Sequence, residues 1–335
     1  PTMKNSLQVK RRVWSAALLL LLFSASCNLR ALTPPPPIAT SSVGLPAPYE
    51  TPLPVRRAYK PGELVDYTAQ TGDTLPSLAA RFNTTVVEIL EANPFIPRDA
   101  TTMPPGMPMK IPIYYRPLWG SPFQILPDSL FVNGPAQIGF DAVSFVDQQP
   151  GWFKNYSFYL GKRDCRGGEI IEYIATEYSI SPRLLLAILE YQTGGLSQPQ
   201  PAVDMDQYPL GYRDQFSQGL ARQLLWAANT LNNGYYGWRT GSLDTIHLMD
   251  GRLENPDPWQ NAASVALHHY FAQIYPQEAY EYAISGEGFL RVYTALFGDP
   301  WANVEAHIPG SLTQPEMSFP FPAGKVWAFT GGPHT

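Results

Sequence analysis

Prolines divide this sequence into short segments and limit its fold more than any other feature. The chain has 35 prolines among its 335 residues, roughly twice the usual frequency of about 5%. Because proline interrupts a helix from within, the chain cannot form one continuous helical bundle. Hydrophobic residues make up 44% of it, which is enough to bury real cores. We therefore expect about two domains with linkers between them.

Charge and cysteine content argue against a nucleic-acid partner, a disulfide scaffold and a cysteine-built zinc site. The chain carries 23 Lys and Arg against 28 Asp and Glu, a formal net charge of −5. A nucleic acid is therefore not expected as a partner. The two cysteines, Cys27 and Cys165, are too few for a disulfide scaffold or a cysteine-built zinc site.

The first 27 residues are typical of a secretory signal peptide. Lysines and arginines precede an apolar run over 13–23, which is too short to span a bilayer. The run ends in Ser24-Ala25-Ser26-Cys27. The small residues suit ordinary signal peptidase, and they also resemble the lipobox of bacterial lipoproteins, in which Cys27 receives a lipid anchor. Without lipid, Cys27 and Cys165 could form a disulfide in an oxidising compartment.

These alternatives place the chain outside the cytoplasm in either case. We expect an exported protein of the cell envelope, either lipid-anchored or secreted. It would contact a membrane only through the signal peptide or a lipid on Cys27. Residues 28–62 follow as a linker, with four consecutive prolines at 34–37. Such a tract favours polyproline II geometry and acts as a semi-rigid spacer.

Residues 63–115 show the order strand, helix, helix, strand. The run 64–68 alternates like a strand, and the turn that follows can cap a helix starting at Leu75. A second helix starts at Thr85 and stops at Asn93-Pro94, because proline forbids its continuation. Residues 109–113 then indicate a closing strand. The segment is therefore predicted to be a compact two-layer unit.

Residues 64–115 resemble a LysM domain. The resemblance rests on Tyr67-Thr68-Ala69-Gln70-Thr71-Gly72-Asp73-Thr74-Leu75, Ala79-Ala80-Arg81-Phe82, Glu91-Ala92-Asn93-Pro94 and Lys110-Ile111-Pro112. It implies binding to the N-acetylglucosamine units of peptidoglycan or of a chitin-like glycan. The two loops that form the groove in that family map to Gly72, Asp73, Thr74, Leu75, Asn93, Pro94, Phe95 and Ile96. The alternative is that these residues only build turns and core.

Residues 116–160 are rich in aromatic side chains and irregular in pattern. Short runs such as 136–140 alternate like strands. We interpret this stretch as a connector that packs on the next domain, and an aromatic platform for sugars is the alternative.

Residues 161–300 are predicted to form an all-α domain. Helical spacing of apolar residues extends over 169–178, 182–193, 219–231, 262–275 and 288–297. The run from Ile180 to Leu189 resembles the lytic transglycosylase and goose-type lysozyme fold. In that family the helix ends in a glutamate followed by Ser or Thr and Gly, and this glutamate is the general acid.

This chain has Gln192 at the position of that acid, followed by Thr193-Gly194. A neutral amide cannot deliver the proton that glycoside cleavage requires. Glu190 lies two positions earlier, about 200° around the helix, and is the remaining carboxylate near that position. We therefore expect a lysozyme-like domain that holds sugar without cleaving it. An active glycosidase of the lytic transglycosylase type that uses Glu190 or another carboxylate is the alternative.

After a linker over 301–317, residues 318–335 end in Gly331-Gly332-Pro333-His334-Thr335. This segment resembles the opening strands of a lysostaphin-like, LytM-type zinc endopeptidase, and the resemblance makes His334 the first zinc ligand. One histidine cannot hold a catalytic zinc, which needs three protein ligands. We therefore expect no cofactor in this chain and zinc in a full-length protein. The alternative is a polar tail.

The combined prediction is a multidomain α+β protein. It has a βααβ LysM module, an all-α lysozyme-like domain and a short β start of a third domain. Its function is predicted to be peptidoglycan binding, as the targeting part of a peptidoglycan hydrolase. The alternatives are an active lytic transglycosylase and a non-enzymatic lipoprotein that tethers membrane to wall.

Overall fold

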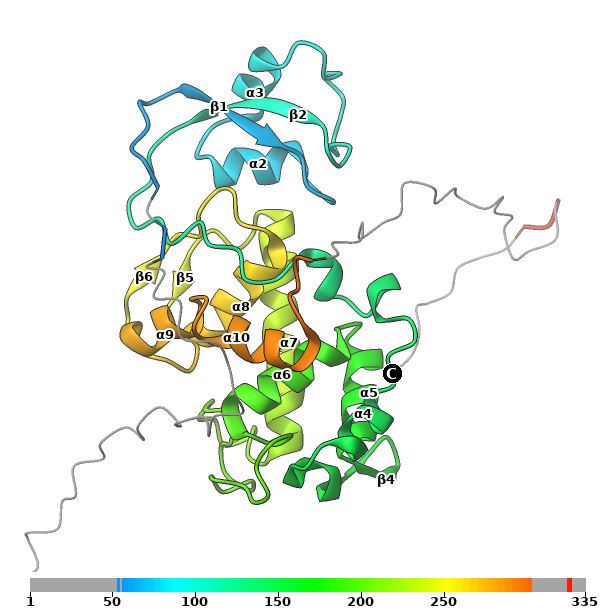
Figure 1. Ribbon diagram of the computed structural model, residues 1–335. Coiled ribbons are helices and arrows are strands. Elements are labelled where there is room, and N and C mark those ends of the chain that lie inside the picture. The colour runs from blue at the N-terminus through cyan, green and yellow to red at the C-terminus, as the bar shows by residue number, and fades with distance from the viewer. Residues whose placement is uncertain (1–52, 55, 303–323, 327–335) are drawn as a thin grey trace, which may run out of the picture. The chain divides into compact units, whose positions relative to one another are not determined.

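The computed structural model describes residues 53–54, 56–302 and 324–326 (Figure 1). The predicted signal peptide, Cys27, most of the 28–62 linker, the 303–317 part of the second linker and His334 lie outside these residues. Within the described residues, no helix is both long and apolar enough to cross a membrane.

The first module consists of a two-stranded sheet and two helices. Its elements are β1 (Glu63–Thr68), α2 (Leu75–Arg81), α3 (Val86–Ala92) and β2 (Pro108–Ile113). The two strands are antiparallel, with Val65 opposite Ile111. Thr74 and Thr85 each begin a helix with a capping box, which satisfies backbone amides that have no partner within the helix. The predicted order of strand, helix, helix and strand is therefore present.

The core of this module lies between the sheet and the two helices. Leu78, Phe82, Ile89 and Ile111 are completely buried in it. Trp259, from a distant part of the sequence, packs edge-on against Phe82 with ring centroids 4.9 Å apart. The module is therefore completed by a side chain that lies outside its own sequence.

Residues 116–302, which we call the second domain, form helices and two small hairpins. Its helices are α4 (Ala142–Gln148), α5 (Gly167–Glu177), α6 (Pro182–Thr193), α7 (Leu220–Thr240), α8 (Ala262–Ala272), α9 (Gln277–Ala283) and α10 (Phe289–Phe297). The hairpins are β3 (Ser157–Leu160) with β4 (Arg163–Arg166), and β5 (Ile246–His247) with β6 (Leu253–Glu254). The prediction of an all-α domain was therefore wrong in this respect.

The alternating run at 136–140 does not form a strand. Residues Pro135–Gln137 form a 3-10 turn, with proline in the first turn, where it needs no amide donor. Gly139 then has a φ of +82°, which no strand adopts. The strand predicted from alternating side chains was wrong here, because the backbone preferences of Pro135 and Gly139 determine the conformation.

Helices α7 and α8 pack closely against each other. A Cβ added at Gly234 would lie 2.8 Å from the Cα of Ala266, so only glycine permits this close approach. Phe131, from the predicted connector, stacks on Tyr235 of α7 with ring centroids 4.2 Å apart. Part of the 116–160 stretch thus contributes to the core of the second domain.

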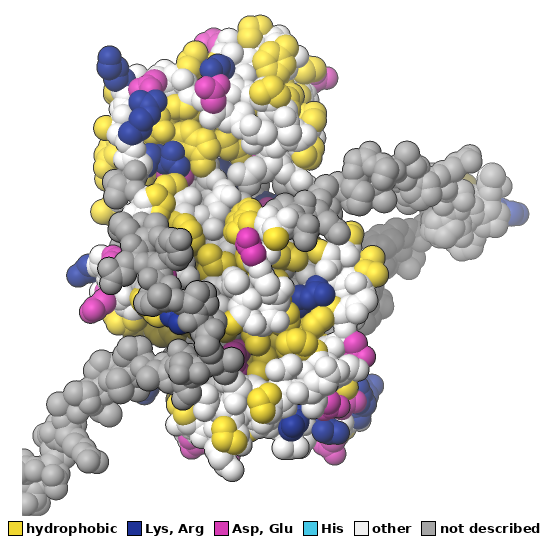
Figure 2. Space-filling model, in the orientation of Figure 1, with side chains coloured by type: hydrophobic (Ala, Val, Ile, Leu, Met, Phe, Trp, Pro, Cys, Tyr) yellow, Lys and Arg dark blue, Asp and Glu magenta, His cyan; other side chains and the backbone are white. Residues whose placement is uncertain are grey.

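The surface carries both signs of charge. On the face shown in Figure 2, Lys and Arg side chains are interspersed with Asp and Glu.

Candidate glycan-binding site

The loop between β1 and α2 is held by a buried carboxylate. Asp73 is 2% exposed. It accepts hydrogen bonds from the Tyr67 hydroxyl at 2.6 Å and the Gln70 amide at 2.7 Å. It also pairs with the Arg81 guanidinium at 2.7 Å. Burial and the negative charge of Asp73 raise the pKa of Tyr67 well above its ordinary value, so its hydroxyl remains a donor.

The same loop is joined to a later segment. The Leu75 amide donates to the carbonyl of Thr101, and the Met103 amide donates to the carbonyl of Asp73. Leu75 is 1% exposed and belongs to the core. The backbone of the first predicted loop is thus fixed from both sides.

The second predicted loop follows α3 and is fixed by Asn93. The Asn93 amide nitrogen donates to the carbonyls of Ile89 and Lys110, each at 2.6 Å. Its oxygen accepts from the Lys110 amide at 2.8 Å. Asn93 therefore ties the end of α3 to β2. Ile96 is 6% exposed and packs in the core, whereas Phe95 is 63% exposed.

The eight residues predicted to bind glycan therefore fall into two groups. Asp73, Leu75, Asn93 and Ile96 are buried and shape the loops. The residues whose surface a ligand can reach are Gly72, Thr74, Pro94 and Phe95. The polar side chains of Asp73 and Asn93 form hydrogen bonds that fix the loops. From the residue types alone, this structural role cannot be told apart from a role in sugar binding.

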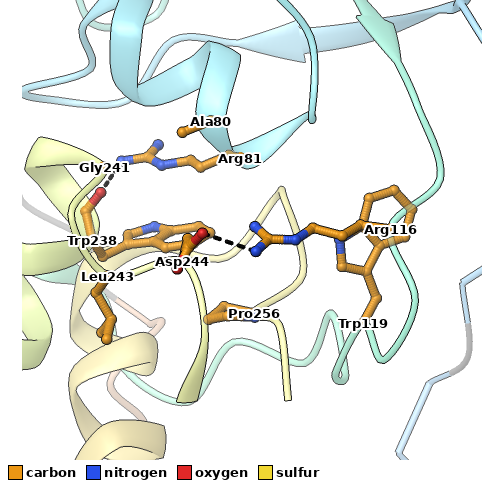
Figure 3. Close-up of a pocket in the computed structure, with 9 residues that line it drawn as sticks. All are labelled: Ala80, Arg81, Arg116, Trp119, Trp238, Gly241, Leu243, Asp244 and Pro256. Atoms are coloured by element: carbon orange, nitrogen blue, oxygen red, sulfur yellow. Dashed lines mark hydrogen bonds and ion pairs between the residues drawn. The ribbon is translucent and has the colours of Figure 1, made fainter. Parts of the chain in front are cut away.

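Arg81 links the module to the second domain. Its Nη2 donates to the carbonyl of Trp238 at 3.1 Å, and its guanidinium lies 4.6 Å from the centre of the Trp238 ring (Figure 3). The pocket beside this contact is only about 10 Å³, room for one water molecule at most. Its lining residues are Ala80, Arg81, Arg116, Trp119, Trp238, Gly241, Leu243, Asp244 and Pro256.

A larger open pocket of about 270 Å³ lies beside Trp259. The Arg56 guanidinium lies 4.0 Å from the centre of this indole ring, and the ring of Tyr59 stacks at 5.8 Å. Arg56 is also paired with the buried Asp257. The indole in this pocket is therefore already packed against two side chains.

Gln192 and Glu190 both have structural partners. The Tyr275 hydroxyl donates to Gln192 Oε1 at 2.8 Å, and Gln192 Nε2 is buried without a partner. Burial raises the pKa of Tyr275 to about 12, so it stays protonated. The Glu190 carboxylate accepts from the amides of Leu196 and Ser197, and thereby holds the turn after α6.

We expect neither the wild type nor Gln192→Glu to cleave glycan strands. A general acid must reach the glycosidic oxygen, and the amide nitrogen at this position is sealed from solvent. The measurement is turbidity clearing of purified cell walls, with analysis of released sugars. Clearing by Gln192→Glu and none by the wild type would contradict this prediction.

No cluster of three or more metal-ligating side chains occurs among the residues that the structure describes. Cys165 is buried and has no disulfide partner within the part of the chain that the structure describes, and its Sγ lies 3.5 Å from the carbonyl of Leu160.

Two known protein families match parts of the chain. Residues 124–311, more than half of the sequence, match the family described as LasA, N-terminal domain. Residues 67–112 match the LysM domain family, which confirms that resemblance. No curated protein and no solved structure matches the chain. The resemblances to lysozymes and to a LytM-type peptidase remain predictions.

Proposed function

The chain belongs to the family of the LasA N-terminal domain, and we propose that it is an exported protein that holds a peptidoglycan hydrolase on the cell wall. Its LysM module would bind the N-acetylglucosamine units of the glycan. The observation that carries the proposal is the LysM match, which coincides with a folded βααβ unit. The LasA match indicates a cell-wall hydrolase.

The finer parts of the proposal rest on sequence resemblance. Export follows from the basic and apolar pattern of the first 27 residues. A zinc endopeptidase as the hydrolase follows from the resemblance of residues 318–335 to LytM-type enzymes, with His334 as a ligand. In such a zinc endopeptidase, zinc would supply the Lewis acid chemistry. The LysM module would supply binding to the wall.

The test is retention of the full chain on insoluble peptidoglycan, compared between two variants. Phe95 and Val87 are each 63% exposed in the LysM module, but only Phe95 lies in a predicted binding loop. We expect Phe95→Ala to weaken binding several-fold, because an exposed ring can cover a sugar face. Val87→Ala is expected to bind like the wild type. Equal binding by all three proteins would argue against the site, and no binding by the wild type would overturn the proposed function.

A further inference from the structure

One arginine of the second domain lies directly on the predicted glycan loop. A Cβ added at Gly72 would lie 1.7 Å from Nη2 of Arg239 and 2.4 Å from its Cζ. The guanidinium therefore occupies the space that a side chain at position 72 would fill. Gly72 also has a φ of +85°, a backbone conformation that favours glycine.

The guanidinium of Arg239 keeps donors for a ligand. Its Nη1 donates to the Tyr235 hydroxyl at 2.9 Å. Nε and Nη2 have no acceptor among the described residues. Neither atom is completely buried. Arg239 is half-buried, so these two groups are partly exposed along the edge of the guanidinium that lies against Gly72. They are donors of a charged group, and a charged donor forms a strong hydrogen bond to a carboxylate.

The charge of Arg239 also lacks a direct counterion. No carboxylate of the described chain lies within 4.0 Å of its guanidinium. The charge of Arg81 beside it is paired with Asp73. Asp128 is close enough for Arg239 to act on its ionisation, but it is buried and accepts from Asn261 and the Ala263 amide. An anion from outside is therefore the natural partner of Arg239.

We propose that Arg239 completes the LysM site and binds a carboxylate of the glycan. The inference rests on the proposed function, since it assumes that the Gly72 loop binds sugar. Peptidoglycan carries free carboxylates on its stem peptides, whereas chitin is neutral. Arg239 thus gives the chain a preference for peptidoglycan over chitin, and it comes from the second domain and not from the LysM module.

The test measures binding of the full chain to three insoluble ligands. These are peptidoglycan, peptidoglycan whose carboxylates have been amidated, and chitin. We expect Arg239→Gln to weaken binding to peptidoglycan about tenfold or more, as for loss of a charge-assisted bond. Its binding to chitin and to amidated peptidoglycan should equal that of the wild type. Arg213→Gln, at an exposed arginine of the same domain, should change none of the three.

The comparison of native with amidated peptidoglycan uses only the wild type, so it remains informative even if Arg239→Gln folds poorly. Amidation alone should weaken wild-type binding to the same degree, and added salt should weaken binding only to native peptidoglycan. The inference would be overturned if Arg239→Gln lost binding to chitin and to peptidoglycan equally. It would also be overturned if the variant bound both ligands more tightly, because Arg239 would then cover the site. Wild-type binding that is insensitive to amidation would overturn it while the proposed function stands. No wild-type binding to any ligand would overturn both.

Discussion

Asp73→Asn is expected to cost about 3–5 kcal/mol of stability, because it leaves a buried charge without its partner. The Asp73 and Arg81 side chains are 2% and 3% exposed. Asparagine keeps the shape but not the charge. The measurement is urea unfolding, with the free energy of unfolding extrapolated to water.

Asp66→Asn is the matched control for this change. Asp66 pairs with Lys110 in the same module, but the two side chains are 87% and 51% exposed. An exposed pair of this kind contributes about 0–1 kcal/mol. Similar losses in the two variants would contradict the assignment of Asp73 as the residue that holds the loop. A loss confined to Asp73→Asn would mean that the carboxylate of Asp73 serves the stability of the loop.

The local order of the first module could be predicted because its signals are local. Thr74 and Thr85 are caps within the segments they start, and Pro94 stops the second helix from the next position. These effects involve neighbours in sequence, so the residues alone carry them. The same reasoning could not assign a role to Asp73, because its partner Arg81 also donates to the carbonyl of Trp238, which is 157 residues away in the sequence.

The contacts between the two domains could not be predicted for a similar reason. Arg81 and Trp238 are 157 residues apart, and Arg239 meets Gly72 over a comparable distance in sequence. No periodicity or motif connects such positions. The failure at 136–140 is different, since Pro135 and Gly139 were visible in the sequence and their backbone preferences outweigh side-chain alternation.

Trp238→Ala is expected to cost about 3–5 kcal/mol, the usual loss for truncating a buried aromatic residue to alanine. Trp238 is 2% exposed, and its indole nitrogen donates to the carbonyl of Gln260 at 3.1 Å. The substitution keeps the backbone carbonyl that accepts from Arg81, so the loss reports on the ring itself. Urea unfolding is again the measurement, and Trp301→Ala, at an exposed tryptophan, should change stability by about 0.5 kcal/mol or less.

The double variant Asp73→Asn with Trp238→Ala tests whether the two domains share one network. Both residues act on the same guanidinium, Asp73 through an ion pair and Trp238 through its ring face. Residues that share a partner show interaction energies of about 0.5–3 kcal/mol, whereas independent sites add to within about 0.5 kcal/mol. We expect the combined loss to be smaller than the sum, because each single change already weakens the hold on Arg81. Additive losses would mean that Arg81 serves the two domains separately, and that the LysM loop is positioned without help from the second domain.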